Sequence, residues 1–312
     1  MNILITGSSG FIGSNLYANM HKDFNLLGLD ITTKGVFPPS SIYSWEDLEQ
    51  LPPVNTIIHL AGKAHDTKNT SDPQSYFDIN TGLTKTIFDY FLESKAEKFI
   101  FFSSVKAIAD SVNGEFLTEG VEPNPQTPYG QSKLEAERYI LSKTLPKNKK
   151  VYILRPCMIH GPGNKGNLNL LYSIVKKGMP WPLGAFENKR SFLSIDNLAF
   201  ILRQLIEKNI KSGIYQVSDD DPISTNKLFS LIATSLQRKP RIINTPKGLV
   251  NLLAKTGDIL HLPINTERLN KLTENYIVSN EKIKKALEID SLPTTAEDGI
   301  IKTINSFKNQ EQ

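Results

Sequence analysis

Residues 2–14 read Asn2-Ile-Leu-Ile-Thr-Gly-Ser-Ser-Gly-Phe-Ile-Gly-Ser14, and a helical pattern continues to Met20. The apolar run 2–5 predicts a buried parallel strand. The glycines let the backbone turn tightly and approach a pyrophosphate at the N-terminus of the following helix, although their spacing is Gly-x-x-Gly-x-x-Gly rather than the dinucleotide fingerprint. This unit predicts a dinucleotide-binding sheet, with cofactor contacts from Gly7, Gly10, Phe11, Ile12 and Gly13.

A second strand with an acid at its end follows. The stretch Asn25-Leu-Leu-Gly-Leu-Asp30 ends in a carboxylate about 20 residues after the turn. A carboxylate there accepts hydrogen bonds from both hydroxyls of an adenosine ribose and repels a 2′-phosphate. The sequence therefore favours NAD over NADP, with an ordinary acid at a strand end as the alternative interpretation of Asp30.

Strand-like runs alternate with helical patterns along the chain. Expected strands cover 2–5, 26–30, 56–60, 98–102, 151–155 and 214–217, and expected helices cover 11–20, 73–94, 128–143, 168–177 and 196–208. This alternation predicts an α/β fold, a Rossmann doubly wound parallel sheet covered on both faces.

The segment from Gly161 to Arg190, rich in Gly, Pro and Asn, predicts loops and one helix outside the sheet. Ser191-Phe-Leu-Ser-Ile195 is expected to return to the sheet, with Asp196 capping the next helix. We therefore expect an NAD-binding Rossmann domain formed by 1–160 and 191–218. The remaining segments, 161–190 and 219–312, form a smaller, discontinuous C-terminal substrate lobe.

The composition excludes several classes of protein. The chain has 312 residues, 39% of them hydrophobic and 22% charged, as in an ordinary soluble globular protein. Cys157 is the only cysteine, so an internal disulfide is impossible and a reducing, cytoplasmic location is expected. We find no signal peptide, no apolar run of membrane-spanning length, no metal-ligand pattern and no nucleic-acid signature. The net charge of +4 is compatible with an anionic substrate.

Tyr129-Gly-Gln-Ser-Lys133 carries the predicted chemistry. A Tyr and a Lys four residues apart share one face of a helix. A nearby ammonium favours the phenolate, so we expect Lys133 to lower the pKa of Tyr129 and allow it to take a proton from a hydroxyl near neutral pH. The alternative is a solvated helix face, but here the pair follows a Gly-rich strand–turn–helix unit and Ser103-Ser104.

Several motifs occur in a fixed order along the chain. They are Thr6-Gly-x-x-Gly-x-x-Gly13, Asp30, Ile58-His-Leu-Ala-Gly62, Asn80, Phe102-Ser-Ser104, Tyr129-x-x-x-Lys133, Arg155-Pro156, Gly161-Pro162 and Asn188-Lys-Arg-Ser191. Together they resemble the extended short-chain dehydrogenase/reductase family, in its nucleotide-sugar epimerase/dehydratase branch, and specifically the subgroup acting on UDP-glucose and UDP-N-acetylglucosamine. The resemblance covers nearly the whole chain.

The resemblance implies roles for individual residues. Tyr129 is the implied base, Lys133 also holds the nicotinamide ribose, and Ser104 bonds the substrate oxygen, with Ser103 as the rival for that role. Further cofactor contacts are implied for Leu60, Ala61, Gly62 and Asn80. Substrate diphosphate contacts are implied for Asn167 and Arg190, and a plain helix cap is the alternative for Asn167.

The implied reaction is NAD-dependent 4-epimerisation of a UDP-hexose or UDP-N-acetylhexosamine through a 4-keto sugar. A close rival is a 4-keto reductase that makes a deoxy amino sugar for surface polysaccharide, and a rival of another class is a catalytically inactive NAD-sensing regulator. The family's 4,6-dehydratases carry Asp-Glu after their active Thr, whereas this chain has Val105-Lys106. An apolar residue and a cation cannot eliminate water, so a 4,6-dehydratase is not expected.

Further interpretations concern two histidines, one amphipathic stretch and a dimer surface. His59 is expected to be structural, and His65 is a candidate for the border of the sugar site. The amphipathic stretch 248–262 is interpreted as a helix packed in the lobe, with a contact to a membrane surface or a partner as the alternative. Helices 73–94 and 128–143 offer a surface for a possible homodimer.

Overall fold

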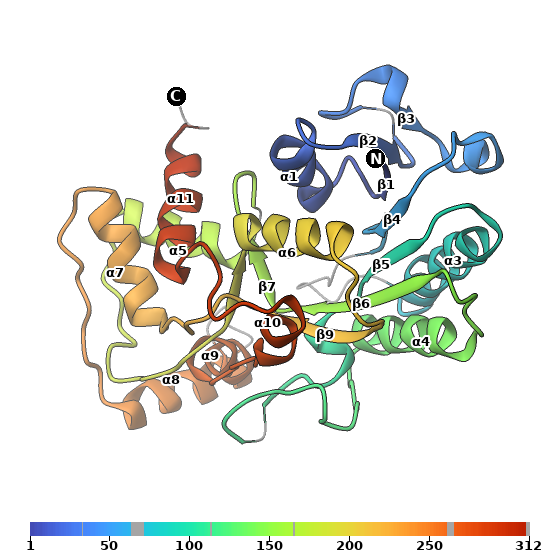
Figure 1. The fold of residues 1–312 in the computed structure, drawn as a ribbon. Helices are drawn as coiled ribbons and strands as arrows, with labels where there is room; N and C mark the ends of the chain where they lie inside the picture. The colour runs from blue at the N-terminus through green and yellow to red at the C-terminus, as the bar shows by residue number, and fades with distance from the viewer. Residues whose placement is uncertain (33, 64–71, 113, 165, 261–264, 310–312) are drawn as a thin grey trace.

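A computed structural model of the chain describes residues 1–32, 34–63, 72–112, 114–164, 166–260 and 265–309. Seven strands form one sheet in the order β3-β2-β1-β4-β5-β6-β9, and all neighbouring strands are parallel. The strands are β1 Asn2–Thr6, β2 Asn25–Leu29, β3 Ile42–Tyr43, β4 Thr56–His59, β5 Lys98–Phe102, β6 Lys150–Pro156 and β9 Gly213–Val217. The predicted doubly wound Rossmann sheet is confirmed (Figure 1).

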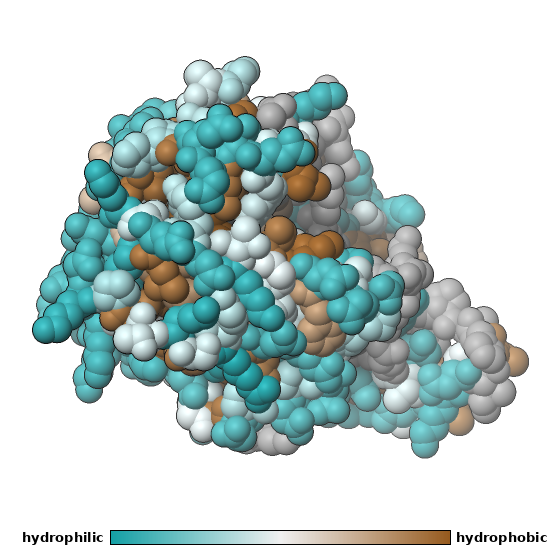
Figure 2. All heavy atoms as spheres, turned by 90° about the vertical axis from the view of Figure 1, so that its right-hand side faces the viewer, coloured by the Kyte–Doolittle hydropathy of each residue, from teal (hydrophilic) through white to brown (hydrophobic). Residues whose placement is uncertain are grey.

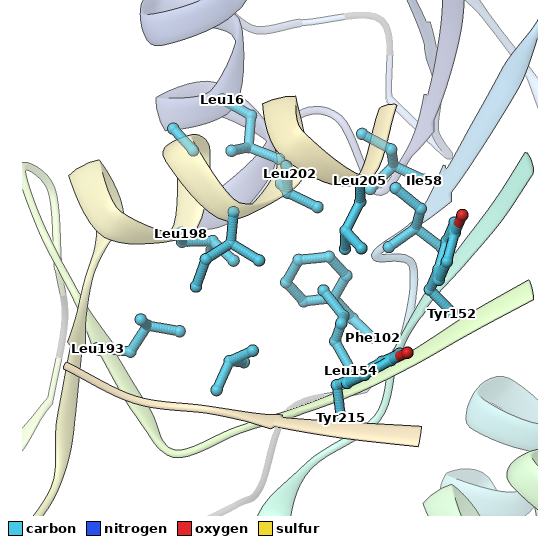
Figure 3. Packing of buried hydrophobic residues seen from close by; sticks show 14 of the residues in the cluster. Leu16, Ile58, Phe102, Tyr152, Leu154, Leu193, Leu198, Leu202, Leu205 and Tyr215 are labelled. Carbon is cyan, nitrogen blue, oxygen red and sulfur yellow. The ribbon is translucent and has the colours of Figure 1, made fainter. Parts of the chain in front are cut away.

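Helices cover both faces of this sheet. On one face lie α1 (Phe11–Met20) and α6 (Ile195–Glu207), which pack against each other. On the other lie α3 (Leu83–Glu93) and α4 (Pro128–Ser142). Figure 3 shows Leu198, Leu202 and Leu205 of α6 directed towards Phe102 and Leu154 of the sheet. The strands read as nearly continuous apolar runs because both faces are buried.

The predicted helix 73–94 is interrupted. It consists of α2 (Gln74–Tyr76), the π-helical segment η3 (Phe77–Gly82) and α3. Within η3, Asn80 is fully buried, and its side chain accepts a hydrogen bond from Lys63 N and donates one to Ser132 Oγ of α4. The wider turn places this amide between α4 and the loop after β4, as π-helical turns often do at functional sites.

The second lobe has its own core. It contains α5 (Asn167–Lys176), α7 (Thr225–Ser235), α8 (Lys247–Ile259), α9 (Thr266–Thr273) and α11 (Ala296–Asn309). Buried side chains of these helices, such as Leu171, Phe229 and Ile304, pack together. The helix α10 (Glu281–Leu287) instead packs on β9, and its Ile283 and Leu287 join the core of the Rossmann sheet. The division of the chain into domains stays a prediction.

One expected strand belongs to a different sheet. Residues 191–195 were expected in the central sheet, but β8 (Phe192–Ser194) pairs only with β7 (Met158–His160), in a separate parallel pair. The helix after it is capped by Ser194, whose side chain accepts from Asn197 N, whereas Asp196 lies within the first turn. The expectation was wrong because a short apolar run does not say which neighbour it pairs with.

Short 3-10 segments complete the described elements, namely η1 (Pro39–Ser41), η2 (Trp45–Gln50) and η4 (Val105–Ala107). None of the helices in the described parts of the chain is long and apolar enough to cross a membrane. Figure 2 shows a mainly hydrophilic surface with small, separate apolar groups on the side where α3 and α4 lie.

A buried ion pair joins α4 to β6 and yields a stability prediction. Glu137 and Arg155 have side chains 1% and 3% exposed and form two hydrogen bonds. Glu137→Ala leaves a buried guanidinium unpaired, so we expect the free energy of unfolding to fall by about 3–5 kcal/mol. Glu135→Ala on the same helix, where the pair with Lys85 is exposed, should cost about 0–1 kcal/mol. Urea denaturation compares the two variants, and equal losses would contradict this account.

Candidate active site

The candidate site lies at the carboxyl ends of the central strands. The chain winds outward from β1 in one direction through β2 and β3, and in the other through β4, β5 and β6. Ligands bind at such a switch point, outside the carboxyl ends of the strands. Gly7 follows β1, Leu60 follows β4 and Ser103 follows β5, so three predicted segments meet at this edge.

The glycine-rich turn after β1 has no room for side chains. A Cβ on Gly13 would lie 2.5 Å from the Ser8 carbonyl oxygen. Gly7 has φ +68°, and a Cβ there would lie 2.8 Å from Ala61 N in the loop after β4. Because no side chains project from these glycines, a ligand can approach the backbone at the N-terminus of α1. Gly10, Phe11 and Ile12 are exposed or half-buried there. This cradle fits the pyrophosphate of a dinucleotide.

Asp30 stands beside this cradle. Its carboxylate accepts hydrogen bonds from Ser9 N at 2.8 Å and from Ile31 N at 2.7 Å. These contacts hold the carboxylate next to the glycine-rich turn, where an adenosine ribose would lie if the pyrophosphate occupies the cradle. The residues thus fit NAD, as the sequence predicts.

Tyr129 and Ser104 come together at the end of β5. Tyr129 lies in the first turn of α4, and Ser104 is the cap of η4. Burial raises the pKa of Tyr129, while a hydrogen bond with the Ser104 hydroxyl lowers it in part. The expected lowering of this pKa by Lys133 is therefore wrong for this structure, in which burial dominates.

Lys133 is buried one helical turn beyond Tyr129. Its ammonium donates to the carbonyl of Phe102, at the end of β5, over 2.9 Å. Burial lowers the pKa of Lys133 to about 8, and the charge of Glu137 opposes that shift. A Cβ on Gly62 would lie 3.2 Å from this ammonium and 2.7 Å from Asn80 Oδ1. Lys133, Asn80 and Gly62 therefore meet as the sequence predicts, next to Leu60 and the buried Ala61.

The two adjacent serines have different partners. The hydroxyl of Ser103 donates to Glu137, which also pairs with Arg155. Ser103 is thus held inside the fold, whereas Ser104 contacts Tyr129. The geometry favours Ser104 over Ser103 as the hydroxyl beside the proposed base.

His59 is enclosed beneath the site. It is 0% exposed, with Nδ1 2.7 Å from Thr6 Oγ1 and Nε2 3.0 Å from Thr84 Oγ1. Burial, together with the charge of Lys133, holds the pKa of His59 well below its usual value. A neutral imidazole with both nitrogens engaged supports the structural interpretation. His65 lies outside the described residues.

Arg190 and Lys106 lie against the ring of Tyr276, and these three residues are here called the cationic wall. Of the three, only Arg190 was predicted from the sequence as a site residue. Its backbone pairs with both Ile223 and Tyr276, and its guanidinium carbon lies 6.0 Å from the centre of the Tyr276 ring. Lys106 Nζ lies 4.8 Å from the same ring. Tyr276, whose hydroxyl donates to Ala109 O, thus joins both cations. Nothing in the local sequence around Tyr276 marks it, because its contacts come from segments far away in the chain.

Asn167 is the first residue of α5 and is exposed. The helix is capped by Gly166, with the Asn169 side chain accepting from Gly166 N. The alternative interpretation of Asn167 as the cap is therefore wrong. Its predicted contact with a diphosphate stays a prediction.

The fold, the glycine cradle and the Tyr–Lys–Ser set define a nucleotide-dependent short-chain dehydrogenase of the extended type. Residues 3–218 match the model of the NAD dependent epimerase/dehydratase family, and the chain belongs to this family. The family is NAD-dependent, so the expected cofactor is confirmed, while the role of Asp30 in selecting it stays a prediction.

Relatives carry epimerase and reductase names. The chain is 30% identical to a UDP-glucose 4-epimerase of Vibrio cholerae, covering 98% of this chain and 95% of the relative. It is 27% identical to an N-acetyl-alpha-D-glucosaminyl-diphospho-ditrans,octacis-undecaprenol 4-epimerase of Escherichia coli O157:H7, over 91% and 85%. A GDP-6-deoxy-D-mannose reductase of Pseudomonas aeruginosa is 24% identical, over 78% and 83%.

Solved structures agree with the fold. A UDP-N-acetylglucosamine 4-epimerase from Bacillus cereus superposes with a TM-score of 0.77 at 18% identity, covering 99% of both chains. A UDP-glucose 4-epimerase of Thermus thermophilus in complex with NAD gives 0.74 at 20% identity, also over 99% of both.

The position of Asp30 predicts its effect on cofactor choice. Asp30→Ala removes an acceptor for the ribose hydroxyls and the charge that repels a 2′-phosphate, so NAD should bind more weakly and NADP relatively better. Calorimetric titration with both cofactors measures the change. Asp23→Ala, at an exposed acid of the same domain, serves as the control. A wild-type preference for NADP would refute the role of Asp30.

The position of Tyr129 predicts a loss of turnover. Tyr129→Phe removes the hydroxyl that is predicted to exchange the proton, and we expect turnover to fall at least about a hundredfold while NAD still binds. Tyr139→Phe makes the same chemical change on α4, where the hydroxyl bonds Asp89, and should keep near wild-type turnover. Steady-state kinetics decides, and a Tyr129→Phe enzyme as active as the control would exclude Tyr129 as the proton-transferring group.

Proposed function

We propose that this protein is an NAD-dependent nucleotide-sugar 4-epimerase acting on a UDP-hexose or UDP-N-acetylhexosamine. The observation that carries the proposal is the contact of Tyr129 with Ser104 at the switch point, with Lys133 buried on the same helix face. An inactive NAD-sensing regulator needs no such set of proton-handling groups. The UDP-glucose and N-acetylglucosamine 4-epimerases among the relatives support the same reaction class.

Tyr129, Ser104 and Lys133 have separate roles in the proposed reaction. NAD, when bound, accepts a hydride from the sugar carbinol carbon and later returns it. Tyr129 takes the carbinol proton, and the Ser104 hydroxyl holds the same sugar oxygen in place. Lys133, whose ammonium donates to the Phe102 carbonyl one helical turn beyond Tyr129, is the proposed contact for the nicotinamide ribose. The 4-keto sugar then rotates in the site so that its opposite face meets the cofactor, and Tyr129 returns the proton to the sugar oxygen.

The cationic wall offers a place for the substrate diphosphate. Arg190 is half-buried, and burial lowers its pKa while the charge of Glu274 raises it. An Arg fork matches two phosphate oxygens at once. Lys106 lies against the same Tyr276 ring, but its charge is partly neutralised by Asp110 at 3.6 Å, so Arg190 is the stronger candidate. Arg190 is therefore the proposed diphosphate contact, with Asn167 at the start of α5 as a further candidate.

A second candidate is a 4-keto reductase acting on a UDP-4-keto-6-deoxy-hexosamine. In that reaction the Tyr129 hydroxyl would supply a proton to the keto oxygen. Reductases also occur among the relatives. The epimerase is preferred because the relative with the highest identity above is an epimerase that matches almost end to end.

The two candidates differ in cofactor balance. An epimerase keeps the reduced cofactor through the ketose stage, so it should interconvert UDP-sugars with no net absorbance change of NADH. A reductase consumes one reduced cofactor per product. The enzyme is offered UDP-N-acetylglucosamine, UDP-glucose and a UDP-4-keto-6-deoxy sugar separately, with Tyr129→Phe as the inactive control. The epimerase proposal would be contradicted if NADH were oxidised stoichiometrically with the keto sugar and neither UDP-N-acetylglucosamine nor UDP-glucose were converted to its epimer.

A further inference from the structure

The helix α8 exposes apolar side chains on a side that nothing in the described chain covers. Its buried side is formed by Val250 and Ala254. Leu249, Leu252, Leu253 and Leu260, here called the leucine stripe, are 49%, 61%, 57% and 61% exposed. At 3.6 residues per turn these four positions fall within an arc of about 100°, separate from the buried side. A helix packed only within its own lobe would present polar residues there.

The chain leading into α8 is positively charged. Residues 222–257 contain no Asp or Glu. They include six exposed cations, namely Lys227, which pairs with Glu297, and Arg238, Lys239, Arg241, Lys247 and Lys255. The exposed Asp258 follows in the last turn of α8. In Figure 1 the segment between α7 and α8 runs along the outer margin of the lobe, at the left, and α8 continues along its lower margin.

A second acid-free segment lies against the first. Residues 163–186 also lack Asp and Glu. Trp181 pairs with Ile242, and Arg241 donates to the carbonyl of Gly178. The exposed Met179 and Ile243 add apolar surface beside these cations, at 51% and 50% exposure.

We propose that this margin of the second lobe docks on an anionic lipid bilayer, with the leucine stripe inserted among the headgroups and acyl chains. Apolar residues on one side of a helix, flanked by Lys and Arg, are the pattern that binds such an interface. Each cation near an anionic membrane adds attraction, and the absence of acids along residues 163–186 and 222–257 reduces the opposing repulsion.

A second copy of this chain fits the same surface less well. Self-association through the leucine stripe would bring two acid-free, cationic margins together, and like charges across an interface are unfavourable. Four leucines on one helix also fall well short of the roughly 800 Å² that each partner of a stable interface buries. The charge pattern therefore selects the bilayer. This inference does not depend on the proposed reaction.

Vesicle flotation tests the docking. The full-length protein is mixed with vesicles of phosphatidylglycerol and phosphatidylethanolamine in equal parts, or of phosphatidylcholine alone. We expect binding to the anionic vesicles only, and release at high salt. The double variant Leu252→Asn/Leu253→Asn should weaken binding about a hundredfold, roughly tenfold for each leucine removed from the interface.

Matched variants separate the two contributions. Arg238→Gln/Lys239→Gln should weaken binding about 25-fold, roughly fivefold per charge. Leu141→Asn, an equally exposed leucine on α4, and Lys22→Gln/Lys95→Gln on the Rossmann domain should leave binding unchanged. Circular dichroism confirms that each variant is folded.

Three results would overturn the proposal. The first is an absence of binding to either vesicle. The second is binding that the leucine and charge variants weaken no more than their controls. The third is a wild-type dimer, seen by analytical ultracentrifugation, that Leu252→Asn/Leu253→Asn converts to monomer, because that result would assign the leucine stripe to a second copy of the chain.

Discussion

A hydrogen bond from the Lys133 ammonium to the carbonyl of Phe102 joins the helix of the proposed base to the end of β5. This bond holds α4 over the point where β5 delivers Ser104, so Tyr129 and Ser104 meet. It also brings a buried charge next to Gly62 and Asn80, whose positions follow from the loop after β4 and from the π-helical turn. Because the bond is buried, water does not compete for it. The site therefore depends on how closely α4 packs against the sheet, and the Glu137–Arg155 pair secures that packing at β6, the third strand from β1.

The central sheet was predictable from the sequence because each of its longer strands is a short apolar run followed by a turn. The predicted bounds of the helices α1, α4 and α6 differ from the observed bounds by at most one residue. Their ends were predictable because each helix follows a local signal, such as the glycine-rich turn before α1. Two features were not predictable. The π-helical turn at Asn80 keeps the apolar spacing of an ordinary helix, and it is stabilised by Lys63 and Ser132, which lie elsewhere in the chain. The pairing of β8 with β7 likewise depends on the position of the second lobe.

The site residues show a similar division. Glycine spacing, the acid after β2 and the Tyr–Lys pair were visible in the sequence because they lie within single elements. The choice between Ser103 and Ser104 could be made only from the structure, because the Ser103 hydroxyl donates its hydrogen bond to Glu137 of α4. The pKa of Tyr129 is raised rather than lowered because burial of the phenol is the largest effect on it, and the spacing of Tyr129 and Lys133 in the sequence does not reveal that burial. Tyr276 was missed because its two cationic neighbours come from loops some distance apart in the chain.

The two sides of the molecule differ in how their charges are arranged. On α3 and α4 several exposed charges form pairs between the two helices or with the residue after α4, as in Lys85–Glu135 and Lys143–Asp89. A homodimer through these helices stays a prediction, and a second copy would have to match or displace these pairs. The margin of the second lobe instead combines cations with exposed leucines and has no acids along two adjoining segments. Charges that are neutralised locally exert little attraction at a distance, whereas a surface with one sign of charge attracts an anionic partner. The second lobe, rather than the Rossmann sheet, is therefore the part of this enzyme suited to hold a negatively charged surface.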